Sequence, residues 1–159
     1  MATINALTPD DRPWVAAWIR EHWGDETMAL RGELWRPAEH AGFAAIDEGT
    51  VVGLATYTVA GAACELLSLD SLREGQGVGG ALLEAVAEAA RTAGCMWLQL
   101  ITTNDNLRAL GFYQRRGFRI IGVNPGAVDR ARATIKPAIP PVAANGIPIR
   151  DEIELLREL

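Results

Sequence analysis

The sequence contains little that would build a metal centre or a disulfide framework. Among its 159 residues there are only two cysteines, Cys64 and Cys95, and only two histidines, His22 and His40. The cysteines form no CxxC pair and the histidines lie far apart, whereas structural zinc sites and disulfide scaffolds use closely spaced sets of such residues. We therefore expect no bound metal and no disulfide.

Long apolar runs and dense positive charge are also missing. No apolar stretch approaches the ~20 residues of a membrane span. Residues 1–10 lack the basic flank and apolar core of a signal peptide. The net charge is −5 and no basic cluster could follow a phosphate backbone. We therefore expect a cytoplasmic protein with neither a membrane nor a nucleic acid as partner.

The apolar residues that are present suffice for one compact domain. Hydrophobic residues make up 49% of the chain and charged residues 22%, as in ordinary globular proteins. The length also fits one hydrophobic core. We expect a single domain over residues 1–159.

The first half of the chain predicts a strand, a helix and an antiparallel meander. A strand is expected over residues 3–7 and a helix from an N-cap at Thr8 to Gly24. The pattern over residues 25–40 is irregular, with at most one short helix. Three strand-like runs joined by tight turns then predict the meander, at residues 42–46, 51–59 and 64–72.

The second half alternates between helical and strand-like patterns. Residues 77–93 predict a helix whose buried stripe comprises Val78, Leu82, Val86, Ala89 and Ala93. A buried strand over 96–102, a short helix ending at Gly117 and a strand over 118–123 follow. This order predicts a mixed α/β fold, in which a central mixed, mostly antiparallel twisted sheet is flanked by helices.

The end of the chain is harder to assign. Residues 124–149 hold five of the eight prolines and predict an ordered connection or a lid, with one helical turn around 128–134. The apolar residues of 151–159 suit a helix and a strand equally, so both assignments stay open.

A glycine-rich segment joins the last strand of the meander to the long helix. Gly75, Gly77, Gly79 and Gly80 fall within six residues. A strand, a glycine turn and a helix N-terminus together form an anion site, because unpaired backbone N–H groups and the helix dipole face the ligand. A tight turn alone needs fewer glycines, so phosphate binding is the favoured interpretation.

The same segment also fits the dinucleotide pattern GxGxxG, from Gly75 to Gly80. That pattern requires an acidic residue at the end of the next strand to hold a ribose. Thr102 and Thr103 occupy this position, and the segment follows a meander instead of the first strand of a βαβ unit. A nicotinamide-dependent oxidoreductase is therefore a weak alternative.

A second motif follows in the order expected for one family. It reads Asn106-x-x-Ala109-x-x-Phe112-Tyr113-x-x-x-Gly117-Phe118. Together with the glycine segment, in which Gly77 and Gly79 fill the glycine positions of a pyrophosphate loop, it resembles the GNAT superfamily of acetyl-CoA-dependent N-acyltransferases. The resemblance implies the GNAT fold, acetyl-CoA as co-substrate and an amine acceptor, either a small molecule or a peptide.

The resemblance also implies roles for individual residues. Tyr113 corresponds to the family's general acid at the leaving sulfur, and an aromatic core residue beside Phe112 is the alternative interpretation. Glu65 is our candidate general base, with a solvent-facing carboxylate as a nearly equal interpretation and Asp70 as a second candidate base. The implied coenzyme contacts are Leu69, Ser71, Leu72, Glu74, Gly75, Gln76, Gly77, Val78, Gly79, Gly80, Asn106 and Tyr113.

One position departs from the family pattern. Glu74 stands where the pyrophosphate loop usually begins with Arg or Gln, and a carboxylate there repels phosphate. Arg73 precedes it and is the nearest residue able to compensate. The departure bears on how tightly the coenzyme binds.

The acceptor side of the site is less defined by the sequence. Trp23, Met28, Trp35 and His40 are candidates to line its pocket, while Trp14 and Trp18 fit the core. Residues 21–48 hold seven acids against two arginines, which favours a cationic acceptor. Basic residues in the tail suggest an acidic group instead, so both options stay open; these residues are Arg130, Arg132 and Lys136.

Two further questions concern mechanism and assembly. Neither Cys64 nor Cys95 has a histidine nearby in sequence to activate it, so direct transfer in a ternary complex is favoured over an acyl-cysteine. A non-catalytic acyl-CoA-binding sensor on the same fold is the alternative function. A homodimer is expected by resemblance alone.

Overall fold

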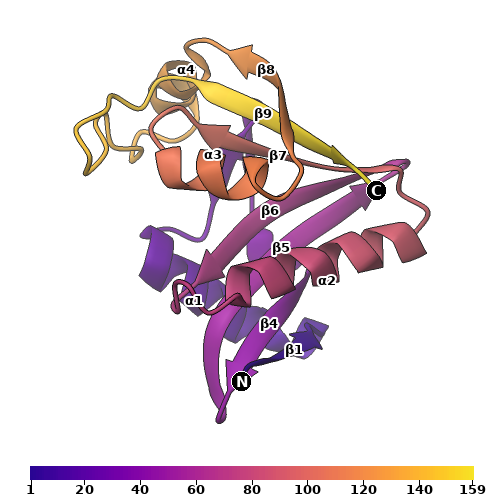
Figure 1. Cartoon of the computed structure of the whole chain (residues 1–159). Helices are drawn as coiled ribbons and strands as arrows, with labels where there is room; N and C mark the ends of the chain where they lie inside the picture. Colours follow the sequence, from indigo (N-terminus) through magenta and orange to yellow (C-terminus); the bar gives the residue numbers. More distant parts are fainter. The chain divides into compact units, whose positions relative to one another are not determined.

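The computed structural model describes all of residues 1–159 (Figure 1). The chain divides into two compact units. The first unit comprises Met1–Glu26, Arg36–Leu98 and Leu159, and the second comprises Thr27–Trp35 and Gln99–Glu158. The prediction of one domain over residues 1–159 stays a prediction.

The first unit contains the predicted antiparallel meander. Its strands run side by side in the order β1-β4-β5-β6, and every neighbouring pair is antiparallel. Their bounds are β1 Thr3–Ala6, β4 Ala41–Asp47, β5 Thr50–Ala60 and β6 Ala63–Ser71. Glu48 and Gly49 both have positive φ in the β4–β5 turn, as tight two-residue hairpins require.

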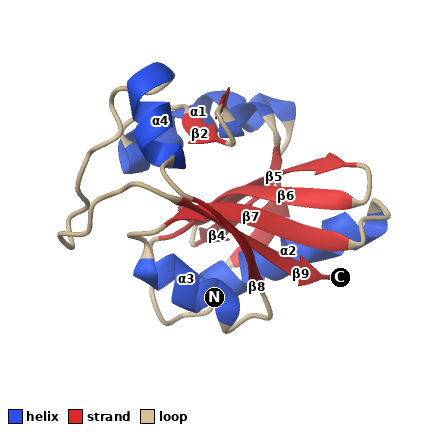
Figure 2. Cartoon of the chain, turned by 90° about the horizontal axis from the view of Figure 1, so that it is seen from above, coloured by secondary structure: helices blue, strands red, loops and turns tan.

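Two helices cover opposite faces of this meander. Helix α1, Arg12–Trp23, follows a short 3₁₀ turn, ends at Gly24 as predicted, and packs Val15 and Ile19 in a core cluster with Leu54 of β5. Helix α2, Val78–Thr92, lies so close to Gly53 that a Cβ there would be 2.9 Å from Leu82. Because neighbouring strand residues point to opposite faces, α1 and α2 lie on opposite sides of β5 (Figure 2).

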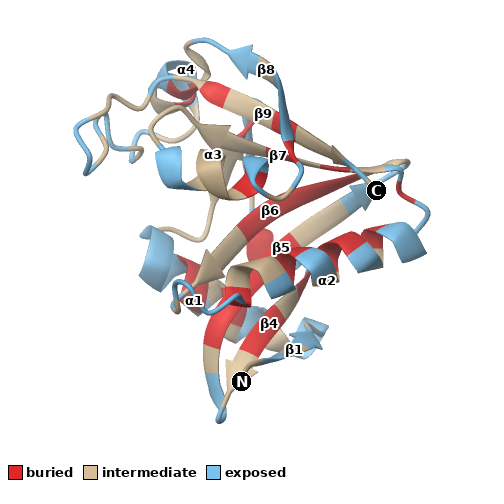
Figure 3. Cartoon of the chain, viewed as in Figure 1, coloured by how far each residue is buried: buried red, intermediate tan, exposed pale blue.

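The buried stripe of α2 differs partly from the prediction. Val78, Leu82 and Val86 are buried as expected, but Ala89 is only half-buried and Ala93 is exposed. Other positions complete the stripe, namely Leu83, Ala87 and Ala90. The helix packs on β4, β5 and β6, so it buries two adjacent rows of side chains in place of the single row that the sequence suggested. Figure 3 shows buried and exposed segments alternating along α2.

The second unit contains three strands in the order β7-β9-β8, together with two helices. The bounds are β7 Trp97–Thr103, α3 Leu107–Gln114, β8 Arg119–Asn124, α4 Ala127–Thr134 and β9 Glu152–Glu158, the first two residues of β7 belonging to the first unit. The C-terminal segment, for which helix and strand stayed open, is a strand antiparallel to β8. The mixed α/β fold with a mostly antiparallel sheet and flanking helices is thus confirmed.

A hairpin occupies part of the region that was expected to be irregular. Strands β2, Met28–Leu30, and β3, Glu33–Trp35, pair through a turn at Arg31 and Gly32, both with positive φ. The one short helix that the sequence allowed in this region is a 3₁₀ turn at Pro37–Glu39. Three-residue strands are too short for alternation to show in the sequence, and arginine is not a turn signal.

The proline-rich connection is ordered by two polar side chains. Arg132 of α4 donates to the carbonyl oxygens of Ile139, Pro140 and Ile149 at 2.8–2.9 Å. The Asn104 carboxamide accepts from two backbone N–H groups at 3.0 Å, one of them that of Asp151. The predicted helical turn is α4. None of the helices in the chain is both long and apolar enough to span a membrane.

Candidate functional site

The glycine segment forms an uncapped helix N-terminus in the first unit. Strand β6 ends at Ser71, and α2 starts at Val78 with Gly77 as its N-cap residue at φ 78° and ψ 5°. No side chain caps this end and its first turn carries no acidic residue. The first N–H groups of an α-helix have no partner within the helix, so these donors face outward with the positive end of the helix dipole behind them.

The glycines leave open space beside this backbone. Gly75 and Gly77 both have positive φ, 72° and 78°, which side chains rarely adopt. A Cβ built on either residue would meet nothing within 4 Å. A ligand can therefore approach the main chain here without a side chain in the way. Open space, outward N–H groups and the dipole together fit the diphosphate of a nucleotide coenzyme.

Two opposite charges flank this segment. Arg73, the predicted compensating cation, pairs with Asp47 of the β4–β5 turn. The terminal ammonium of Met1 lies 3.3 Å from the same carboxyl group. The Arg73 hydrogen bond, aided by that ammonium, lowers the pKa of Asp47 below its ordinary value. Arg73 is thus already neutralised by a carboxylate, while Glu74 is exposed, so the segment lacks the free cation expected for a tight diphosphate site.

One face of β6 carries polar side chains. Glu65 lies opposite Thr58, Ser68 opposite Thr56, and Asp70 opposite Leu54. Directly paired residues share a face. The β5 partners alternate, so all three β6 side chains lie on the face that α1 covers. In a regular strand Glu65 would point to the opposite face from Ser68 and Asp70, because successive side chains alternate between faces. Leu67 has no partner on β5, and this extra residue brings Glu65 onto the same face as the other two.

The candidate base Glu65 and the two cysteines are all buried. Glu65 lies near the start of β6 with 7% of its surface exposed. Its neighbour Cys64 is fully buried, and burial, with a smaller contribution from Cys95, raises the pKa of the Cys64 thiol to about 12. A thiol with so high a pKa is almost entirely protonated at neutral pH and is a poor nucleophile. Both cysteines are free.

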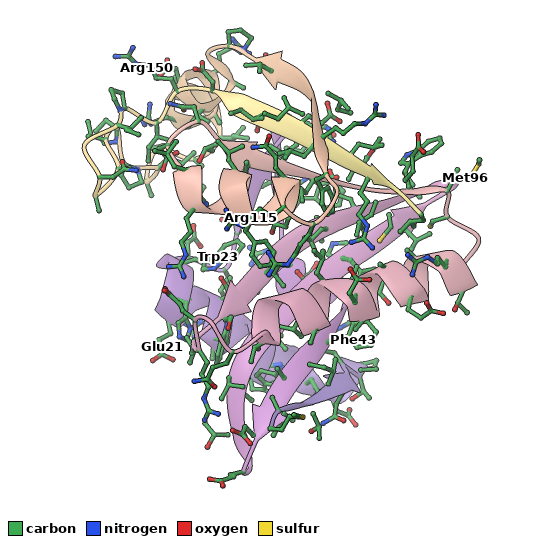
Figure 4. The ribbon with its side chains drawn as sticks, in the orientation of Figure 1. Glu21, Trp23, Phe43, Met96, Arg115 and Arg150 are labelled. Atoms are coloured by element: carbon green, nitrogen blue, oxygen red, sulfur yellow. The ribbon has the colours of Figure 1, made fainter.

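Asp70 contacts a tryptophan predicted for the acceptor pocket. Trp23, the last residue of α1, is labelled in Figure 4. Its Nε1 donates to both carboxylate oxygens of Asp70, at 3.0 and 3.1 Å. The two residues are far apart in the chain. They meet because α1 packs on Leu54 of β5, which lies directly opposite Asp70, and no pattern in the sequence reveals such a contact.

The remaining predicted pocket residues are distributed over both units. His40 lies in the first unit, where burial lowers its pKa. Met28 and Trp35 are directly paired across the β2–β3 hairpin of the second unit. The tail cations are engaged locally, since Arg130 donates to Asn124 and Lys136 donates to the carbonyl oxygen of Thr27. With Arg132 bound to carbonyl groups, all three tail cations make local hydrogen bonds, and both options for the charge of the acceptor stay open.

The second motif shapes helix α3 in the second unit. Asn106 caps the helix, its side-chain oxygen accepting from the N–H of Ala109 at 3.1 Å. Tyr113 is buried near the C-terminal end, with ring centroids 5.2 Å from Phe112 and 5.4 Å from Phe118 in edge-on contact. These contacts hold the ring in one orientation. The expectation that Tyr113 is an aromatic core residue and the expectation that it is catalytic are both compatible with this packing.

No group of three or more histidine, cysteine and acidic side chains is arranged to hold a metal ion.

Residues 4–118 match the Acetyltransferase (GNAT) family. The uncharacterized protein YdhI of Bacillus subtilis (strain 168) is 51% identical over 134 residues, which cover 84% of this chain and 83% of that protein. An IAA acetyltransferase from Bacillus cereus ATCC 14579 has the same fold, with a TM-score of 0.75, 21% identity and full coverage of both chains. A GNAT family acetyltransferase from Elizabethkingia anophelis with acetyl-CoA bound gives 0.71 at 22% identity, over 99% of this chain and 98% of that one. The chain belongs to the acetyltransferase (GNAT) family, as its two motifs indicated.

Proposed function

We propose that this protein transfers the acetyl group of acetyl-CoA to an amine by direct attack within a ternary complex. The observation that carries the proposal is the uncapped N-terminus of α2, opened by glycines and free of first-turn acids. Family membership and the acetyl-CoA bound to a protein of the same fold support the choice of coenzyme.

In this proposal the first unit binds the coenzyme and removes the amine proton. The backbone of segment 74–80 holds the diphosphate, and the end of β6 contributes the neighbouring contacts through Leu69, Ser71 and Leu72. Glu65 accepts a proton from the acceptor, directly or through water. An amine with a pKa near ~10 arrives mostly as ammonium and must lose a proton before it can attack.

The second unit supplies the acid and a coenzyme contact. The Tyr113 hydroxyl donates a proton to the departing sulfur, and Asn106 contacts the coenzyme while it caps α3. Direct transfer is preferred to an acyl-cysteine because burial keeps Cys64 protonated.

The deciding experiment is calorimetric titration of the protein with acetyl-CoA, followed by a thiol-release screen of amines. We expect a micromolar Kd with about one site per chain, and release of free CoA only when an amine is present. Absence of binding at millimolar acetyl-CoA would remove the basis of the proposal. Binding without transfer to any amine would favour an acyl-CoA sensor.

Reversing the charge of Glu74 should strengthen coenzyme binding. The Glu74→Arg variant replaces an exposed carboxylate with a side chain that can bind phosphate oxygens in pairs. We expect the Kd for acetyl-CoA to fall roughly tenfold, about 1.4 kcal/mol, with a steeper salt dependence. Glu88→Arg, which makes the same charge change at an exposed position farther along α2, should change the Kd less than twofold. Equal effects of both variants would mean that only net charge matters.

A homodimer and a cytoplasmic location complete the proposal. Strand β8 ends the strand order of the second unit and exposes about half of the surface of Ile120, Ile121 and Val123. We place the dimer contact on these side chains, since contiguous exposed apolar residues mark interaction surfaces. Sedimentation should give twice the 17.1 kDa chain mass. Ile121→Lys should give monomers, whereas Val142→Lys, at an exposed position outside β8, should not.

A further inference from the structure

Asp70 is a half-buried carboxylate without a cationic lysine or arginine partner. Its hydrogen bonds come from uncharged tryptophan, through Trp23 Nε1. Burial raises the pKa of Asp70 above its ordinary value, which the Trp23 hydrogen bonds oppose only in part. Removing a carboxylate from water without a compensating cation costs free energy. A carboxylate that is partly removed from water without a cation beside it is a candidate for binding a cationic ligand.

The surroundings of Asp70 suit a cation in shape and charge. The indole of Trp18 lies near the same carboxylate and lowers its pKa slightly, yet its buried N–H reaches no acceptor within hydrogen-bonding distance. The His22 ring lies against Trp18 in a tilted arrangement, with a centroid distance of 4.2 Å, and His22 is the titratable residue of α1 that faces Asp70. Tryptophan rings beside a carboxylate are typical of sites that bind ammonium or guanidinium groups.

The other elements around Asp70 add no positive charge. On β5 the residues that face it are Leu54 and Thr56, which do not titrate. On its own strand the nearest acid of the same face is Glu65. Trp23 is 36% exposed, so the edge of this cluster is open to a ligand. The carboxylate retains lone pairs beyond the two that Trp23 occupies.

Asp70 and Glu65 stand on the same face of one strand at a fixed spacing. Five residues of extended chain reach about 16 Å, and the irregularity at Leu67 shortens this somewhat. If Glu65 removes a proton from the reacting amine, a second cationic group of the same acceptor can reach Asp70. An acceptor with two cationic groups set far apart matches this arrangement.

We propose that Asp70, with Trp23 and Trp18, binds a second cationic group of the acceptor, so that the preferred substrates are long diamines or polyamines. This inference rests on the proposed acetyl transfer with Glu65 as base. Asp70 is in this view a specificity residue that lowers the KM for dicationic acceptors and leaves the chemical step to other groups.

The test compares α,ω-diamines of increasing length with monoalkylamines of matched length. Wild-type protein should show a kcat/KM at least tenfold higher for long diamines than for the matching monoamines. Asp70→Asn should abolish this preference by raising the KM for diamines at least tenfold relative to the KM for the matching monoamines. Glu21→Gln, which removes one exposed charge of α1 (labelled in Figure 4), should keep the preference.

Tryptophan fluorescence provides a readout that does not depend on turnover. Binding of 1,8-diaminooctane next to Trp18 and Trp23 should change the emission of wild-type protein, and Asp70→Asn should raise the Kd at least tenfold.

Thermal melting gives a second readout. The Asp70→Asn variant should melt at a higher temperature than wild type at pH 8 and lose this advantage as the pH falls. The raised pKa means that the native state binds a proton at Asp70 more readily than the unfolded state does. Ionisation of Asp70 above this pKa therefore lowers the stability of wild type, and asparagine, which does not ionise, avoids this loss.

The outcomes separate this inference from the proposed function. Diamine binding that depends on Asp70, without acetyl transfer to any amine, would support the cation site and contradict the proposed acetyltransferase activity. Equal use of monoamines and diamines, unchanged by Asp70→Asn, would overturn the cation site and leave the acetyltransferase intact. Trp23→Phe removes the N–H donor and keeps an aromatic ring. It should weaken diamine binding less than Asp70→Asn does, and an equal or larger effect would assign the cation to the indole instead of the carboxylate.

Discussion

Replacing Tyr113 by phenylalanine should lower kcat by at least about 100-fold, the usual contribution of a positioned general acid. Phenylalanine keeps the edge-on contacts with Phe112 and Phe118, so the fold and acetyl-CoA binding should be preserved. The change removes only the hydroxyl that would protonate the departing thiolate. Thiol-release kinetics give kcat, and calorimetry with acetyl-CoA checks that the Kd stays within about twofold.

The size of this effect depends on how the site supports proton transfer. An ordinary tyrosine with a pKa of ~10 protonates a thiolate of ~8.5 against a gradient of about 2 kcal/mol. A thiolate held away from water is a stronger base and narrows that gap. Phe112→Leu is the matched control, because it disturbs the same aromatic contacts and leaves the hydroxyl in place. If Tyr113→Phe turned over at the wild-type rate, the tyrosine would be a core residue, as its burial also allows.

Replacing Gly77 by alanine should raise the Kd for acetyl-CoA by about 100-fold, close to 3 kcal/mol. Gly77 is the N-cap of α2 at φ 78°, and a methyl group there would enter the space through which phosphate oxygens approach the backbone. Calorimetry measures the Kd directly. The folded state should survive, because a Cβ at this position meets no protein atom within 4 Å.

Gly61→Ala is the control for the cost of positive φ alone. Gly61 lies between β5 and β6 at φ 61°, and its Cβ position is equally open. Both variants should lose about 1 kcal/mol of unfolding free energy, which thermal melting can compare. Only Gly77→Ala should lose coenzyme affinity. If Gly77→Ala and Gly61→Ala lost a similar amount of acetyl-CoA affinity, the diphosphate would bind elsewhere. The glycine segment before α2 would then serve only as a tight turn.

The sequence predicted most elements because their signals are local. Turn glycines, helix caps and periodicity act over a few residues, and the structure follows them from β1 to α4 with shifts of at most three positions, apart from the β2–β3 hairpin. The β2–β3 hairpin escaped prediction because its strands are short and Arg31 is not a residue typical of such turns. The C-terminal strand stayed open until its pairing with β8 was known, since periodicity alone suited both assignments.

The candidate site also has some features that the sequence determined and others that only the structure shows. The sequence by itself determined the family, the glycine segment and the second motif, because these features depend on residue type and spacing along the chain. Only the tertiary structure showed that Arg73 is engaged by Asp47 and that Asp70 meets Trp23. The register shift at Leu67 likewise decides which side chains of β6 share a face. Such contacts join residues far apart in the chain, and they arise from how α1 and the strands pack, which no local pattern encodes.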